Sequence, residues 1–187
     1  MTVDCFKLTI HMVSSLDGFI AKKDNSASWF ETTDHYEQGI TMEENESSKF
    51  LESIDCYVMG SRTYEHALEL SETYGWPYGD IPTIVLSQRK FPAARPNIEM
   101  YAGDLNQWVS ERLKPNYMRV WLVGGAKLFK SFIQLNLVDE IRQSILPIIL
   151  GEGLPFYDHI ASELLLHLTE VKAYKTGMVD LCYDIKK

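Results

Sequence analysis

The sequence predicts an α/β fold in which a mainly parallel sheet carries helices on both faces and has an antiparallel edge at the C-terminus. Short apolar runs typical of buried strands alternate with helical patterns as far as residue 145. Two strand-like segments, Leu164–Tyr174 and Met178–Ile185, then follow each other across the turn Lys175–Gly177. Internal repeats and linkers are absent from the 187 residues, so we expect a single domain over residues 1–187.

Strands are expected where short runs of apolar and β-branched residues end at turn-forming residues: Phe6–Val13, Cys56–Met59, Ile81–Leu86, Ile98–Tyr101, Val120–Val123 and Val138–Ile145. Helices are expected where apolar residues recur at helical spacing or a capping pattern opens a segment: Thr41 to about Ser53, Ser61–Leu70, Asp104–Leu113 and Ala126 to about Leu135.

Local signals set the ends of these segments. Thr41 with Glu44 fits a capping box, Asp104 with Gln107 caps a later helix, and Pro115 is expected to stop that helix. Ser14–Ser28 is a long predicted loop, and a connection of that length favours a functional role. Pro147–Pro155 is a second predicted loop, which holds two glycines.

The aromatic segment Tyr74–Asp80, YGWPYGD, is a third predicted loop. It is equally consistent with a pocket lining and with a cover over the core. We expect Trp76 in this segment, and Trp29 in the long loop after the first strand, to lie near a pocket.

Composition limits the classes of function. The hydrophobic content of 45% excludes disorder as the main state, and the net charge of −8 argues against a nucleic-acid groove. Apolar runs of the roughly 20 residues that span a bilayer are missing, so a membrane partner is not expected. The N-terminus lacks the basic start and apolar stretch of a signal peptide, which predicts a cytoplasmic protein.

Cysteines and histidines give little sign of metal or redox chemistry. Cys5, Cys56 and Cys182 lie far apart in strand-like runs, which predicts buried free thiols. The five histidines show no HxxxH or HExxH spacing, so no metal site is expected.

The segment Arg119–Phe129, RVWLVGGAKLF, carries the strongest local indication of function. A buried-strand run, two glycines and a helical pattern follow one another. Glycines let a ligand approach the backbone, and a helix N-terminus offers unpaired N–H groups and partial positive charge. A phosphate-bearing cofactor and a plain tight turn are both open on this pattern alone, which is not the GxGxxG fingerprint.

Five motifs occur in one order along the chain: SLDGFIA at Ser15–Ala21, VMGSRTYE at Val58–Glu65, TIVLSQR at Thr83–Arg89, VWLVGGAKLFKSF at Val120–Phe132 and LVDEIRQSILPIILGEG at Leu137–Gly153. Together they resemble the dihydrofolate reductase superfamily. The first and last resemble the branch that includes the C-terminal reductase domain of the bifunctional riboflavin-biosynthesis deaminase/reductase. The resemblance implies a dihydrofolate-reductase-like, three-layer α/β/α fold.

The resemblance also implies that NADPH lies across the carboxyl ends of the sheet, where open α/β sheets bind ligands. Three groups of residues match the family's cofactor-binding segments: Gly60, Ser61, Arg62 and Thr63; Ser87, Gln88 and Arg89; and Gly124, Gly125, Ala126, Lys127 and Leu128. The first group would meet the cofactor's phosphates, and the third would meet its pyrophosphate and nicotinamide side. The second would hold the adenosine 2′-phosphate. The family has a cis peptide between its paired glycines, so we predict a cis Gly124–Gly125 bond.

Asp17 and Ser15 are the residues that the resemblance places on the substrate side, and Ser14 is a further hydrogen-bonding candidate. Asp17 could orient a substrate hydroxyl or amine or relay a proton, although Asp17–Gly18 also fits a plain turn. Glu31 and Asp34 are alternative proton donors, because true dihydrofolate reductases place a carboxylate near this part of the chain.

The implied activity is hydride transfer from NADPH to a C=N or C=O carbon of a small heterocyclic or carbonyl substrate. We expect a stand-alone reductase that forms a homodimer. Two further readings stay open: the riboflavin-pathway reductase of 5-amino-6-ribosylaminouracil phosphate or a dihydrofolate reductase, and a dinucleotide-binding module without turnover.

Overall fold

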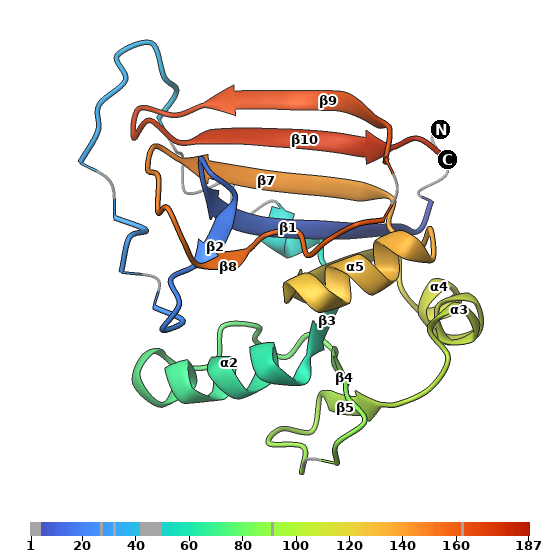
Figure 1. The fold of residues 1–187 in the computed structure, drawn as a ribbon. Helices are drawn as coiled ribbons and strands as arrows, with labels where there is room; N and C mark the ends of the chain where they lie inside the picture. The colour runs from blue at the N-terminus through green and yellow to red at the C-terminus, as the bar shows by residue number, and fades with distance from the viewer. Residues whose placement is uncertain (1–4, 27, 32, 42–49, 91, 162) are drawn as a thin grey trace.

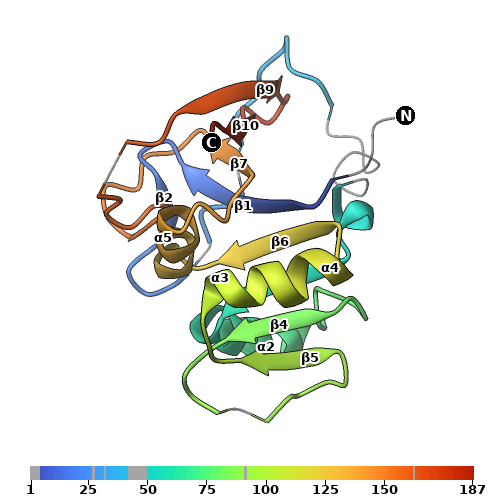
Figure 2. The ribbon, with the colours of Figure 1, turned by 90° about the vertical axis from the view of Figure 1, so that its right-hand side faces the viewer.

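An eight-stranded sheet in the order β5-β4-β3-β6-β1-β7-β10-β9 forms the centre of the molecule (Figures 1 and 2). The structure, a computed structural model, describes residues 5–26, 28–31, 33–41, 50–90, 92–161 and 163–187. The strands are β1 Lys7–Ser15, β2 Phe19–Ala21, β3 Cys56–Gly60, β4 Thr83–Leu86, β5 Ile98–Tyr101, β6 Arg119–Gly124, β7 Glu140–Leu146, β8 Leu154–Pro155, β9 Leu166–Ala173 and β10 Val179–Ile185.

The sheet is parallel from β5 through β7 and antiparallel at β10 and β9. The helical segments are α2 Ser61–Tyr74, α3 Leu105–Trp108, the π-helical turn η1 Val109–Leu113, α4 Lys114–Asn116 and α5 Ala126–Gln134. This arrangement confirms the predicted fold class. None of the helices within the described ranges combines the length and apolar surface that crossing a bilayer requires.

Alternate residues of the central strands face two separate apolar cores, because successive side chains of a strand point to opposite faces. Val58 and Leu122 belong to the larger core, in which α5 and the segment from α3 to η1 pack through Phe132 and Trp108. Their strand neighbours belong to a second core beneath α2: Tyr57, Met59 and Val123 with Tyr64. The sheet therefore lies between two helical layers.

The two long loops predicted after β1 and β7 contain short strands that pair with each other. In β2, Phe19 lies opposite Pro155 of β8, and Ala21 lies opposite Leu154. Sequence reasoning missed this pairing because strands of three and two residues carry too few side chains to show a period.

The helix that Asp104 opens passes Pro115 instead of stopping before it. Asp104 Oδ1 accepts a hydrogen bond from the Gln107 N–H at 2.8 Å, as predicted for the cap. The chain then passes through η1, and Pro115 falls in the first positions of α4. A proline inside a helix removes one backbone N–H donor, and here the irregular turn η1 lies directly before it in place of regular α-helical bonding.

Three further predictions have different outcomes. The Thr41–Glu44 capping box falls largely on residues 42–49, outside the described residues, and only residues 50–53 of that segment are described as helical. Cys56 and Cys182 are buried free thiols as predicted, whereas Cys5 is exposed because it precedes β1. The YGWPYGD loop covers the second core through Trp76 and Tyr78, and burial raises the pKa of Tyr78 to about 12.

A buried ion network lies at the edge of the sheet where β1 and β7 begin and β10 ends. Glu140 is 5% exposed and accepts hydrogen bonds from Lys7, Thr9 and Arg142 at 2.8–3.1 Å. Burial opposes its charge, but the two cations outweigh burial and lower the pKa of Glu140 to about 2. Beside this network, Asp139 Oδ2 accepts the Leu8 N–H at 2.9 Å.

We predict that Glu140→Gln destabilises the protein at pH 7 and that the difference from the parent narrows in acid. A carboxyl group with a lowered folded-state pKa stabilises the fold above its unfolded pKa of 4.5, and this stabilisation is lost as pH falls toward about 2. Urea unfolding at pH 7, 5 and 3 measures the gap. Glu170→Gln is the control. It removes the more exposed ion pair of Glu170 with Lys172 and should lower the free energy of unfolding by less at every pH. A gap that stays constant down to pH 3 would contradict the prediction.

Candidate functional site

The carboxyl ends of β1, β4, β5 and β6 point to one side of the sheet (left in Figure 2). Because β4, β3, β6 and β1 are neighbours in the strand order, the segments that follow them lie next to one another. We call this set of segments the rim: residues 60–63 after β3, residues 87–89 after β4, residues 124–128 after β6, and residues 15–17 at the end of β1. All of the residues proposed from the sequence for the cofactor and substrate therefore lie along one edge.

Two helices begin at the rim without a side-chain cap. Gly60 precedes α2 and Gly125 precedes α5, and neither helix has a side-chain hydrogen bond at its N-cap or an acidic residue in its first turn. The first N–H groups of a helix lack partners within the helix, and its N-terminus favours negative charge. Both starts are therefore suited to phosphate groups.

The two helix starts approach each other closely. Met59 pairs with Gly124 across β3 and β6. A Cβ on Gly60 would lie 3.6 Å from the Gly124 carbonyl oxygen, and one on Gly125 would lie 3.8 Å from Thr63 Oγ1. Gly124 has φ +144°, which favours glycine, and a Cβ there would lie 3.2 Å from Met12 Cε. The peptide between Gly124 and Gly125 is cis, which confirms the prediction.

Arg89 reaches from the segment after β4 to the first turns of α2. Its Nη2 donates to Ser61 Oγ at 3.2 Å and to Glu65 Oε2 at 2.9 Å, while its backbone N–H donates to Ser87 Oγ at 2.9 Å. Its guanidinium group thus lies beside the start of α2. The other predicted polar residues of the rim, Arg62, Gln88 and Lys127, are exposed.

Ser15 and Asp17 connect the end of β1 to the loop after β7. The buried Ser15 hydroxyl donates to Asp17 Oδ1 at 2.6 Å and accepts the Phe19 N–H. Asp17 also accepts the backbone N–H groups of Leu150 and Gly151, at 3.1 and 2.7 Å. The Ser15 hydrogen bond, with these two, lowers the pKa of Asp17. Asp17 is therefore ionised at neutral pH and holds two loops together.

One of the alternative carboxylates, Asp34, lies farther along the same edge. Asp34 lies beside Gly177 in the β9–β10 turn and near Pro147 after β7. The backbone nearby is attached to the hairpin, since the Tyr36 N–H donates to the Lys175 carbonyl at 2.8 Å. Glu31 is exposed. In the strand order, β7 lies between β1 and β10, at whose turn Asp34 is found.

Sequence reasoning missed two residues that shape the rim. Glu65 pairs with Arg89, and its position four residues after Ser61, on the same side of a helix, was the available signal. Gln143 donates from Nε2 to the buried Ser14 Oγ at 2.8 Å. The sequence gives no comparable signal for Gln143, because its partner Ser14 lies on a neighbouring strand that is distant in the sequence.

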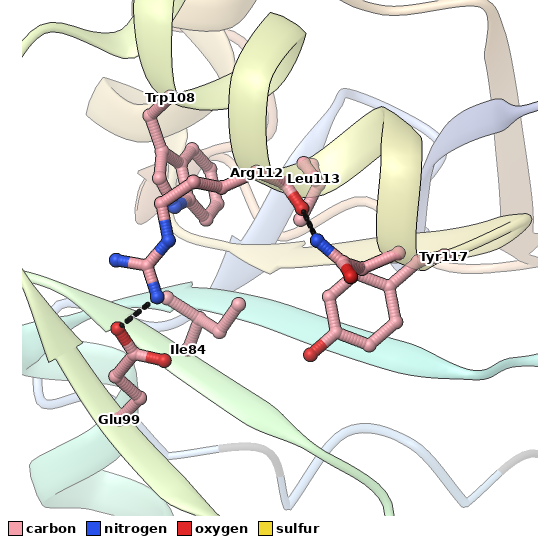
Figure 3. Close-up of a pocket in the computed structure, with 7 residues that line it drawn as sticks. Ile84, Glu99, Trp108, Arg112, Leu113 and Tyr117 are labelled. Atoms are coloured by element: carbon pink, nitrogen blue, oxygen red, sulfur yellow. Dashed lines mark hydrogen bonds and ion pairs between the residues drawn. The ribbon is translucent and has the colours of Figure 1, made fainter.

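Two hollows of the described structure lie apart from the rim. One, of about 410 Å³, is lined by β4, β5 and the segment from α3 to α4 (Figure 3). The other, of about 390 Å³, surrounds the ion network of Glu140. Within the described ranges, His, Cys, Asp and Glu side chains nowhere form a group of three that could hold a metal ion.

Comparison with known proteins indicates the family of this chain. Residues 82–179, just over half of the chain, match the family model described as the RibD C-terminal domain. The uncharacterized protein YwjB of Bacillus subtilis is 27% identical over 90% of this chain and 92% of its own length.

Two solved structures share the fold. A protein of Shewanella sp. PV-4, provisionally named a riboflavin biosynthesis protein, has a TM-score of 0.81 at 22% identity, covering 97% of this chain and all of its own. Dihydrofolate reductase from Enterococcus faecalis, complexed with NADP(H), has a TM-score of 0.59 at 17% identity, covering 97% of both chains.

We predict that Asp17→Asn speeds hydrogen exchange of the Leu150 and Gly151 amides. The amide side chain loses the charge that strengthens both hydrogen bonds, so the loop after β7 opens more often. Hydrogen–deuterium exchange of the folded protein measures this. Asp24→Asn is the control, because Asp24 accepts hydrogen bonds from Ser26 within its own turn and should leave both amides unchanged. Equal exchange in Asp17→Asn and the parent would contradict the role of Asp17 as a tie between loops.

Proposed function

Because the chain belongs to the RibD C-terminal domain family, we propose that it is an NADPH-dependent reductase acting on a small heterocyclic or carbonyl substrate. The observation that carries the proposal is the pair of uncapped helix starts at Gly60 and Gly125, joined at one edge of the sheet. Backbone N–H groups at two neighbouring turns suit a cofactor with a pyrophosphate group.

The fit of the rim to such a cofactor rests on its glycines and cations. Gly125 and Gly60 leave the backbone bare where a ligand would approach it. Arg89 lies beside Ser61 and would grip the 2′-phosphate that distinguishes NADPH from NADH, since a guanidinium group matches phosphate geometry. Its present partner, Glu65, is exposed enough to release it at little cost.

Catalysis by this chain would consist of positioning the reactants. When bound, the cofactor supplies the hydride, which would add to the C=N or C=O carbon while a proton from water goes to the nitrogen or oxygen. Asp17 is ionised, so at neutral pH it would accept a hydrogen bond from a substrate N–H or O–H instead of donating a proton. The buried Ser15 hydroxyl holds Asp17 in this state.

The competing functions make different predictions. Steady NADPH oxidation with dihydrofolate, or with the ribosylaminouracil phosphate of the riboflavin pathway, would assign those substrates. Tight NADPH binding without oxidation by any carbonyl or heterocycle tested would favour a binding module. The ion pair of Arg89 and the ionised Asp17 are compatible with a working site.

We predict that substitutions of Arg89 and of its partner Glu65 change the affinity for NADPH in opposite directions. Arg89→Ala should weaken NADPH binding about tenfold or more and leave NADH binding almost unchanged, because only NADPH carries the 2′-phosphate. Glu65→Gln should strengthen NADPH binding several-fold, because it frees Arg89 from its ion pair. Quenching of tryptophan fluorescence measures both affinities.

Lys114→Ala, an exposed cation of α4 away from the rim, is the control for general loss of charge. Equal losses of NADPH and NADH affinity in Arg89→Ala would remove the 2′-phosphate assignment. Failure of the parent protein to bind either nucleotide would refute the proposed function.

We also propose a homodimer formed through the edge strand β9. Leu165, Leu168 and Val171 are 69%, 47% and 53% exposed, and β9 is the last strand of the described sheet, so this edge presents apolar side chains beside a strand with a single strand neighbour. The double substitution Leu168→Lys with Val171→Lys should convert dimer to monomer in sedimentation equilibrium. Leu70→Lys, at an exposed leucine of α2, should not. A parent protein that sediments as a monomer would refute the dimer.

A further inference from the structure

The hollow that surrounds the ion network of Glu140 is a basic site in an acidic protein. Its volume of about 390 Å³ is within the range of small-molecule sites. Among the nine described residues that line it, Glu140 is the one acid, and four are cations: Lys7, Arg119, Arg142 and Lys172. The whole chain has the opposite balance, with 26 acidic and 18 basic residues. The lining therefore gathers positive charge that the composition does not predict.

The cations belong to a polar face in the middle of the sheet. Lys7 of β1 is the register partner of Arg119 of β6. Arg142 of β7 is the partner of His11, which lies four residues after Lys7 and therefore on the same face of β1. Residues 8 and 10 of β1, on the opposite face, belong to the larger core. Central strands of parallel sheets are usually apolar on both faces, so this polar face requires a chemical explanation.

The buried carboxylate of Glu140 holds two of the cations in position. Its side chain is 7% exposed and accepts hydrogen bonds from Arg142 Nε at 2.8 Å and from Lys7 Nζ at 3.0 Å. The cations themselves remain accessible, since the side chains of Lys7, Arg142 and Lys172 are 29%, 33% and 27% exposed. A ligand would therefore meet donors that are already in place, and its binding would need little ordering of side chains.

The guanidinium group of Arg142 is fixed on two sides. Its Nε binds Glu140, and its Cζ lies 5.1 Å from the centre of the Phe50 ring, within the range of a cation–π contact. Within the described part of the chain, Nε is the one nitrogen of this group with a hydrogen-bond partner. The two terminal nitrogens form the planar fork that matches two oxygens of a phosphate group.

The other acidic partners of these cations are more exposed than Glu140. Asp184 pairs with Lys7 at 3.0 Å and Glu170 pairs with Lys172 at 3.2 Å, and both carboxylate side chains are 44% exposed. Exposed ion pairs contribute little free energy, so a phosphate can replace these partners. Glu140 stays in place and repels an anion, so the affinity of the hollow should be modest.

The hollow is separate from the rim. The residues of β1, β6 and β7 that line it lie in the amino-terminal halves of their strands, whereas the rim follows the carboxyl ends. Lys7 and Ser15 are the opposite ends of β1, roughly 25 Å apart at the usual rise of a strand. A ligand in the hollow is therefore independent of the proposed reductase chemistry.

We propose that this hollow binds a phosphate dianion, either free or as the monoester of a small organic molecule. The terminal nitrogens of Arg142 would donate to two of its oxygens, and Lys7 and Lys172 would contribute charge from either side. Because the lining carries four cations and one carboxylate, a dianion should bind better than a monocarboxylate. A polyanion such as a nucleic acid is disfavoured by the net charge of −8.

The test follows backbone amide signals of the full 15N-labelled chain as phosphate is added at constant ionic strength, above the second phosphate pKa of about 6. We expect saturable shifts at residues 7–9 and 140–142, with a dissociation constant on the order of 1 mM. Acetate, which carries a single charge, should bind about tenfold more weakly. Saturating NADPH should leave the phosphate shifts unchanged.

Ribose 5-phosphate distinguishes the two sources of the phosphate group. Tighter binding of this compound than of inorganic phosphate, with shifts at the same residues, would identify a monoester as the ligand. Equal or weaker binding would identify free phosphate.

Two variants test the cations, and a third is the matched control. Arg142→Lys keeps the charge beside Glu140 but loses the fork, and Lys172→Gln removes a cation whose partner Glu170 is exposed, so both should fold. Each should weaken phosphate binding roughly five- to tenfold. Lys130→Gln should have no effect, because Lys130 of α5 is similarly exposed, at 30%, but does not line the hollow.

Three results would overturn the proposal: no saturable shifts at residues 7–9 and 140–142, equal affinities for acetate and phosphate, or unchanged phosphate affinity in both Arg142→Lys and Lys172→Gln. Phosphate shifts confined to the rim and removed by NADPH would also overturn it, because the phosphate would then occupy the cofactor site. Failure of NADPH to bind while phosphate still binds at the hollow would refute only the reductase.

Discussion

The parallel pairing of β3 with β6 is the constraint on which the candidate site depends. Met59 stands opposite Gly124, and each of the two strands runs directly into a helix. The pairing therefore sets two helix N-termini side by side at one edge of the sheet, and their unpartnered N–H groups are directed to the same region. Gly124 adopts a φ of +144°, which side-chain-bearing residues rarely adopt, so the end of β6 favours glycine at this position. A shift of one residue in register would exchange the buried faces of the strand as well as separate the helix starts.

Electrostatics at the rim are local and do not follow the net charge of the protein. The chain carries −8 overall, yet the start of α2 lies beside Arg89. The Arg89–Glu65 ion pair is exposed and is worth about 0–1 kcal/mol, whereas a guanidinium–phosphate contact is charge-assisted on both sides and is frequently bidentate. A phosphate can therefore displace Glu65.

Two carboxylates of the described structure, Glu140 and Asp17, hold separate segments together. Glu140 is buried in an ion network at the amino end of β7, and Asp17 joins the loops after β1 and β7. Both have pKa values below the ordinary carboxyl range, because the charged form receives several hydrogen bonds. The role of Asp17 as a tie does not conflict with a place beside the substrate, since a carboxylate oxygen can accept more than one hydrogen bond.

The sequence by itself determined the order and type of the main elements, the glycine-pair turn at Gly124 and Gly125, and the family to which the rim residues belong. The family rests on the resemblance of five motifs along the chain, whereas the other signals are local: periodicity, caps and glycines act over a few neighbouring residues. Only the tertiary structure decided that Phe19 pairs with Pro155, that the helix continues past Pro115, and that Arg89 pairs with Glu65. It also decided that Asp17 is bound to the loop after β7 and that Trp108, Arg112 and Glu99 share one hollow. These contacts join residues distant in sequence or depend on an irregular helical turn, so no local pattern specifies them.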